Sequence, residues 1–244
     1  MHARSKGYRR FKDRLDNFQE DLEIIAIVYN NRESLAGADT IFQGVTENGQ
    51  PKLKRRSNSE ASRLLVVQHL RKTLYVSFIK DLYEEVLIYC QYALSQAASH
   101  VTDATRLIGD QNNQTFKINE ILSRTTKEDI FSMVTDRIFR AIEKKKDTLE
   151  LVRALNDRIN LGIAPEIFDK AMPYLEARHL FIHSDGLTDQ EYRDKFPNIK
   201  LTNDHYIKLN PTIIKEAQVA IHNLVLAYDQ KLTENSYIDS DEYK

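Results

Sequence analysis

The sequence is poor in the residues that break helices and in those that crosslink chains. Its 244 residues include only 7 glycines, 5 prolines and one cysteine, Cys90. Few glycines and prolines leave few obligatory turns, which favours long helices over many short strands. A single cysteine excludes an internal disulfide and fits a reducing compartment.

Long apolar runs and a strong net charge are missing as well. The apolar stretches are short and interrupted by polar residues, so we expect no membrane-spanning helix. Residues 1–14 lack the apolar centre of a secretory signal, and we expect a cytoplasmic soluble protein. The formal net charge of -1 excludes a globally basic coat for nucleic acids. Basic runs at 4–14 and 52–56 weakly favour a polyanionic partner.

Hydrophobic spacing predicts helices along most of the chain. A first helix is expected over residues 6–33 and a second over 58–99. The second has no Gly or Pro, and its apolar stripe comprises Val67, Leu70, Leu74, Phe78, Leu82, Val86, Tyr89, Ala93 and Ala97. At about 1.5 Å per residue, a helix of roughly 40 residues is about 60 Å long and can serve as the spine of a bundle.

Capping signals divide the rest of the chain into further helices. Helical segments are expected at 115–143 and 146–160, at 165–186 and after Asn210-Pro211, while residues 204–210 form a small extended piece. Capping-box spacings occur at Ser57/Glu60 and Thr125/Glu128, and residues 188–191 can cap a short helix. Pro173 either kinks its helix or begins a new one.

These segments predict an all-α fold, a helical bundle of five to six helices built on the long second helix. Residues 1–57 would form an N-terminal helix and loop extension, 58–234 the helical domain and 235–244 a flexible acidic tail.

The stretch EARHLFIHSDG, residues 176–186, combines an apolar run with an arginine and two histidines. Arg178 and His179 fall in line with apolar residues, so both are expected near buried surface. His183 lies five positions beyond Arg178, turned by about 140° and displaced by about 7.5 Å along the helix. The two side chains could therefore meet if the helix unwinds before Gly186, or if two copies of the stretch face each other across a two-fold axis.

The side-chain chemistry of this stretch suits RNA cleavage without a metal. An imidazole side chain can give and take protons. An arginine can hold a phosphate bidentately, and the ribose 2′-OH can supply the nucleophile.

The segment RHLFIH at 178–183 resembles the Arg-x4-His signature of the HEPN superfamily. The continuation SDGLTDQEYRDKFP, the YIKLNP segment and the final amphipathic helix look like its stand-alone, RiboL-PSP-type branch. The resemblance implies a helical bundle that forms homodimers, with two motifs in one cleft. It also implies an endoribonuclease that acts on RNA without a cofactor, in a toxin–antitoxin or antiviral system with a possible antitoxin or defence partner protein. Arg178 and His183 would be catalytic, and His179 would orient or contact phosphate. Some members keep the fold without nuclease activity.

Plainer explanations compete with these roles. Arg178 could be a core-edge arginine paired with an acidic side chain, His179 a hydrogen-bonded core histidine and His183 a helix C-cap.

A metal site is a further alternative. Glu176, His179 and His183 lie on one helix face and could bind zinc, with His205 or His222 as an outside ligand. Cys90 fits a small core residue better than a nucleophile.

Overall fold

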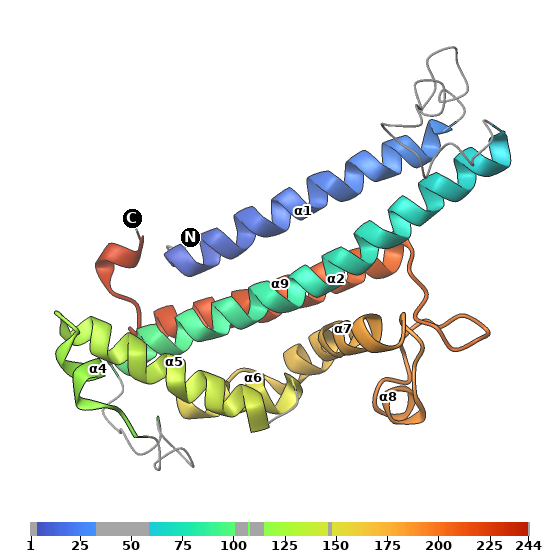
Figure 1. Cartoon of the computed structure of the whole chain (residues 1–244). Coiled ribbons are helices and arrows are strands. Elements are labelled where there is room, and N and C mark those ends of the chain that lie inside the picture. The colour runs from blue at the N-terminus through green and yellow to red at the C-terminus, as the bar shows by residue number, and fades with distance from the viewer. Residues whose placement is uncertain (1–3, 33–58, 101–106, 108–114, 146–147, 244) are drawn as a thin grey trace. The chain divides into compact units, whose positions relative to one another are not determined.

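The computed structural model describes residues 4–32, 59–100, 107, 115–145 and 148–243. Within these ranges the chain is all-α, as predicted, and contains no strand. The helices are α1 (Lys6–Asn30), α2 (Glu60–Ala98), α4 (Ile118–Leu122), α5 (Lys127–Lys145), α6 (Thr148–Arg158), α7 (Pro165–His183), α8 (Gln190–Lys195), α9 (Pro211–Glu234) and the 3-10 helix η3 (Ser240–Tyr243). Figure 1 shows them in order from blue to red.

The described part of the chain has eight α-helices, two more than the upper number expected. The difference lies in α4 and α8, which have five and six residues. Segments this short span too little of the apolar repeat to be recognised by hydrophobic spacing, and only the capping signal at 188–191 indicated α8. The six longer helices correspond to the predicted segments, and the predicted region 115–143 divides into α4 and α5.

Several helix starts follow from their capping residues. Asn210 accepts a hydrogen bond from the Ile213 amide, with Pro211 at the first helical position, as predicted. At α8 the cap is Asp189, which accepts from the Tyr192 amide, whereas Thr188 Oγ1 donates to the His205 carbonyl. At the start of α5, the Asp129 amide donates to Thr126 Oγ1 and the Thr126 amide donates to the Asp129 carboxylate. This capping box lies one residue later than the predicted one at Thr125/Glu128. The predicted cap at Ser57 lies outside the described residues.

The chain divides into two compact units. The smaller is Leu15–Phe78, and the larger combines Met1–Arg14 with Ile79–Lys244. Helices α1 and α2 each contribute residues to both units. The predicted boundary after residue 57 falls within the smaller unit, at residues outside the described ranges.

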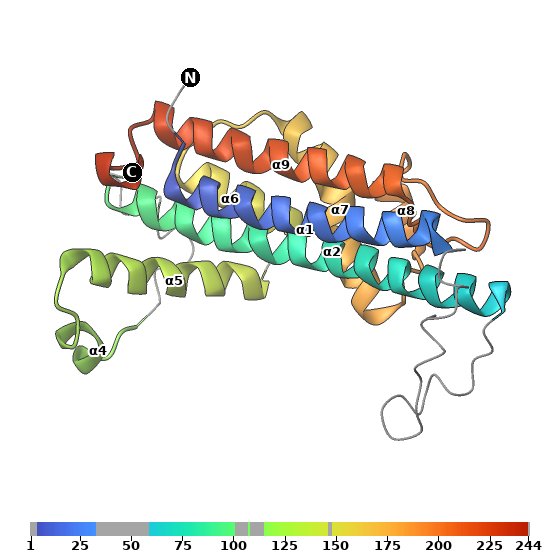
Figure 2. The same cartoon turned by 90° about the horizontal axis from the view of Figure 1, so that it is seen from above.

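In the larger unit, α7 packs against both α9 and α6 (Figure 1). Phe168 of α7 meets Tyr228 of α9 edge to face, with ring centroids 6.3 Å apart, and Tyr228 Oη donates to the Val152 carbonyl of α6. Helix α5 lies beside the C-terminal part of α2 in both views (Figures 1 and 2), where Gln91 Nε2 donates to Asp136 Oδ1 over 2.7 Å. Helix α7 is therefore held within a packed helical core.

The apolar stripe of α2 is buried along most of its length. From Phe78 to Ala97 its members are at most 3% exposed, but Leu74 is half-buried and Leu70 is 45% exposed. No helix in the described ranges is long and apolar enough to cross a membrane.

The C-terminal residues 235–243, expected to be flexible, make specific contacts in the larger unit. Ile238 is buried, and Tyr92 Oη donates to the Glu242 carboxylate. The Arg9 guanidinium donates to the backbone carbonyls of Glu242 and Tyr243. Acidic composition alone could not predict this, because the partners come from α1 and α2.

Candidate functional site

Helix α7 carries the three predicted site residues at its C-terminal end. It begins with Pro165 and continues through Pro173, so no new helix begins at Pro173. His183 is its last residue, and the amides of Ser184 and Gly186 both donate to the Leu180 carbonyl. Gly186 stops the helix as predicted, with a φ of 88° that favours glycine. Arg178 and His183 therefore lie on one uninterrupted helix.

The buried face of α7 changes along the helix. In the first half Phe168, Met172 and Leu175 are buried, whereas in the second half Ala177, Leu180 and Phe181 are buried, roughly half a turn around the axis. His179 continues the first face and was expected near buried surface, but it is exposed, and Ile182 is 42% exposed. On the opposite side of the helix, Gly186 of the chain that follows α7 lies against the Phe181 ring.

Arg178 is half-buried and is held by two consecutive residues of α2. Its Nη2 donates to Glu84 Oε1 over 3.1 Å, and its guanidinium carbon lies 4.7 Å from the centroid of the Tyr83 ring. This is the acidic pairing that was the plainer explanation for Arg178. Tyr83 and Glu84 are more than 90 residues away in sequence, and nothing in the α2 spacing singles them out.

His179 and His183 lie side by side at the end of α7, with ring centroids 4.5 Å apart and an angle of 48° between the rings. Both side chains are exposed, so neither is a core histidine. Among the described residues, no hydrogen bond or ion pair joins Arg178 to either of them. A single chain thus pairs the two histidines and keeps Arg178 separate.

A pocket of about 370 Å³ opens beside Arg178. Four carboxylates and two cationic groups line it, so its charge in one chain is net negative. Burial raises the pKa of Tyr83, which forms part of its wall. The lining residues are Tyr83, Glu143, Thr148, Leu151, Leu175, Glu176, Arg178, His179, Leu180, Asp189, Glu191, Tyr192 and Lys195.

Two residues of the alternative zinc site, Glu176 and His222, have other partners. Glu176 accepts from Lys195 Nζ over 2.7 Å, and His222 Nε2 lies 2.7 Å from Tyr8 Oη. Over the ranges that the structure describes, no three His, Cys, Asp or Glu residues form a group that could hold a metal. Glu176, His179 and His183 share one helix face in the sequence pattern, but they do not form a set of metal ligands in the structure.

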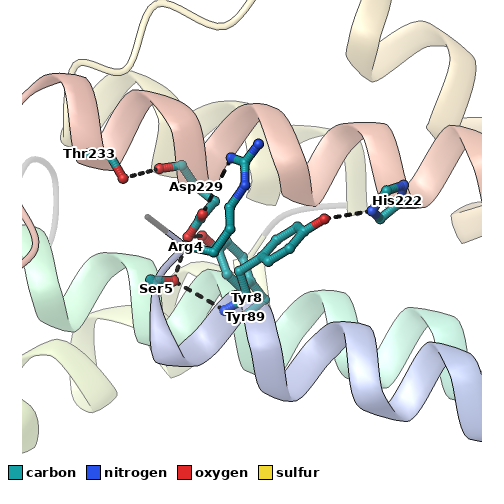
Figure 3. Close-up of polar contacts among 7 residues, drawn as sticks. All are labelled: Arg4, Ser5, Tyr8, Tyr89, His222, Asp229 and Thr233. Atoms are coloured by element: carbon teal, nitrogen blue, oxygen red, sulfur yellow. Dashed lines mark hydrogen bonds and ion pairs between the residues drawn. The ribbon is translucent and has the colours of Figure 1, made fainter. Parts of the chain in front are cut away.

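A second polar cluster, not anticipated from the sequence, surrounds Asp229 of α9 (Figure 3). Asp229 is fully buried and accepts hydrogen bonds from the hydroxyls of Ser5 and Tyr89, while Arg4 Nη1 lies 3.6 Å from its second oxygen. Asp229 lies on the apolar face of α9 between Val225 and Leu232. A charged residue on such a face is the one sequence feature that could have indicated a buried polar contact. The cluster ties the N-terminal segment to the core.

This arrangement also reassigns the basic run at 4–14. Arg4 pairs with Asp229, Arg9 binds the C-terminal carbonyls, and Arg10 and Arg14 each contact Glu85 over 3.3 Å. These four arginines therefore have partners within the larger unit. The run at 52–56 lies outside the described residues.

Cys90 is 2% exposed within α2, and burial raises the pKa of its thiol to about 12. It is a core residue rather than a nucleophile.

Comparison of the whole chain with protein-family models, curated proteins and solved structures found no match.

Proposed function

We propose that this protein is a metal-independent endoribonuclease of the HEPN type, acting as a toxin or antiviral-defence effector. The observation that carries the proposal is the end of α7, where an anchored Arg178 lines a pocket and two exposed histidines stand one turn apart. Together with the RHLFIH motif, this gives a phosphate-binding group and proton-transfer groups within a few residues.

The reaction would use the substrate's own nucleophile. The ribose 2′ oxygen attacks the adjacent phosphorus, a new P–O2′ bond forms and the P–O5′ bond breaks, which leaves a 2′,3′-cyclic phosphate and a 5′-hydroxyl. One imidazole takes the 2′-OH proton and a second proton donor protonates the leaving O5′. Arg178 would neutralise the phosphate, His183 would transfer protons, and His179 would contact phosphate or orient its neighbour.

Helix geometry favours a site shared by two copies of the chain. On the uninterrupted α7, Arg178 and His183 differ by about 140° in direction and 7.5 Å in height. Unwinding before Gly186 would have brought them together, but α7 remains helical through His183. Two copies facing each other would place Arg178 of one chain near His183 of the other, and the exposed Ile182 would lie in the contact.

The contact with Glu84 favours a second candidate, a catalytically inactive HEPN-like module that binds a nucleotide or a partner. Arg178 already has a carboxylate partner, and the carboxylates of the pocket outnumber its cationic groups. Such a module would keep the fold and bind without cleaving.

Incubation with total RNA in EDTA separates the two. Wild-type protein should produce fragments with 2′,3′-cyclic phosphate ends, whereas Arg178→Ala and His183→Ala should lose at least about a hundredfold in rate. Arg140→Ala and His69→Ala, at exposed positions on α5 and α2, serve as matched controls. Wild-type protein as inert as the variants would exclude the nuclease, and binding of RNA without cleavage would favour the module.

Mixed dimers test the shared site. Arg178→Ala and His183→Ala chains, each inactive, should regain part of the activity when refolded together, because one wild-type arginine and one wild-type histidine then face each other across the interface. No recovery from a verified mixed dimer would exclude the shared arrangement.

A further inference from the structure

The guanidinium of Arg178 is held from two directions by consecutive residues of α2. The Tyr83 ring lies against its face, and the Glu84 carboxylate accepts a hydrogen bond from Nη2 at its edge. Stacking on a ring restricts tilting, and a carboxylate at the edge restricts rotation in the plane. Together they give a flexible side chain a defined direction.

Most hydrogen-bonding capacity of Arg178 remains available for a ligand. An arginine has five N–H donors, and within the described part of the chain Arg178 uses one, towards Glu84. Its Nε is buried and has no hydrogen-bond partner among these residues, so the ligand would meet the terminal nitrogens. A phosphate oxygen at those nitrogens would lie within a few ångströms of the Glu84 carboxylate.

We propose that Glu84 is a positioning residue that aims Arg178 and also limits its affinity for phosphate. The inference rests on the proposed function, in which Arg178 binds the scissile phosphate. Glu84 is 55% exposed, so solvent weakens its repulsion of an incoming phosphate without abolishing it. The same carboxylate therefore has two separable effects, one through its hydrogen bond and one through its charge.

Two substitutions separate these effects. Glu84→Gln keeps an oxygen acceptor for Nη2 but removes the charge, so KM for RNA should fall about fivefold with kcat within about twofold of wild type. Glu84→Ala removes both, so Arg178 loses its aim and kcat should fall about tenfold. Glu166→Gln, an exposed position in the first turn of α7 about 18 Å along the helix from Arg178, is the matched control.

A binding measurement that needs no RNA cleavage tests the inference directly. The 15Nε–H signal of Arg178, assigned from the Arg178→Lys spectrum, is followed during titration with inorganic pyrophosphate. Wild-type protein should bind, Glu84→Gln should bind about fivefold more tightly, and Glu166→Gln should match wild type.

The outcomes are distinguishable from failure of the nuclease proposal. If pyrophosphate shifts the Arg178 signal with the predicted order of affinities but no RNA is cut, the inference holds and the nuclease proposal fails. If RNA is cut but Glu84→Gln and Glu84→Ala both match wild type in kinetics and binding, the inference is wrong. Equal loss of kcat in both variants would also overturn it, because the charge rather than the acceptor would then be required. A urea midpoint for each variant checks that the fold is unchanged.

Discussion

Replacing Asp229 should destabilise the protein more than any exposed substitution, because its carboxylate is the common acceptor of the cluster in Figure 3. Asp229→Ala leaves the Ser5 and Tyr89 hydroxyls without their acceptor in a site where Asp229 is 0% exposed, and it removes the partner of Arg4. Breaking a buried, hydrogen-bonded charge typically costs about 3–5 kcal/mol. We expect a loss of that size in the free energy of unfolding.

Graded substitutions make the prediction quantitative. Asp229→Asn can keep an Oδ1 that accepts from both hydroxyls but loses the charge opposite Arg4, so about 1–3 kcal/mol should be lost. Tyr89→Phe removes one donor and leaves Ser5 on the carboxylate, so about 1 kcal/mol should be lost. Gln230→Ala, at the exposed neighbouring position of α9, should change the free energy of unfolding by less than about 0.5 kcal/mol.

Urea unfolding is the appropriate assay, followed by circular dichroism and by tyrosine fluorescence, since the chain has 12 tyrosines and no tryptophan. Coincident transitions and unchanged m-values are needed to read midpoint shifts as free energies. A loss below about 1 kcal/mol for Asp229→Ala, or the order Tyr89→Phe above Asp229→Ala, would refute the role given to this carboxylate.

Three further outcomes are expected. Burial raises the pKa of Tyr89 and of Tyr228 well above the ordinary value near 10. Below pH 10 both tyrosine hydroxyls are protonated in the folded and in the unfolded protein. Above pH 10 these hydroxyls lose their protons in the unfolded protein but keep them in the folded protein. Stability should therefore fall above pH 10 by about 1.4 kcal/mol per pH unit for each tyrosine, and a urea midpoint unchanged from pH 9 to 11 would contradict this. Gly186→Ala should lower the melting temperature by several degrees, because φ is 88° and the added Cβ would lie 2.6 Å from Phe181 Cε1; an unchanged value would mean that the loop relaxes. Cys90 should resist iodoacetamide at pH 8 until urea unfolds the protein, since burial raises its thiol pKa to about 12, and rapid native labelling would disprove its core position.

Local signals in the sequence predicted the local structure well. The Asn210-Pro211 start of α9 and the Gly186 end of α7 depend on groups within a few residues, so the sequence pattern is sufficient. The exact capping residue of a helix is harder to predict where two candidates are adjacent. Thr125 and Thr126 both form hydrogen bonds with Asp129 at the start of α5.

Features that depend on distant partners could not be predicted in the same way. Helical spacing placed His179 on the face of Phe168 and Met172, but the buried residues near the end of α7 lie on the opposite side of the helix and His179 is exposed. The anchoring of Arg178 by Tyr83 and Glu84, and the convergence of Ser5 and Tyr89 on Asp229, join residues far apart in the chain. Spacing within one helix carries no information about such pairs.

The charges around Arg178 bear on how a phosphate would bind there. In one chain Glu143, Glu176, Asp189 and Glu191 outnumber Arg178 and Lys195 in the pocket, and Lys195 is already paired with Glu176. A phosphate brought to a single Arg178 would thus meet a net negative surface. A second copy facing the first would add another Arg178 and another pair of histidines, but it would also add another four of these carboxylates, so the carboxylates would still outnumber the cationic groups. The charge balance of the pocket therefore favours the module that binds without cleaving, and the proposal of a site shared by two chains depends on the helix geometry alone.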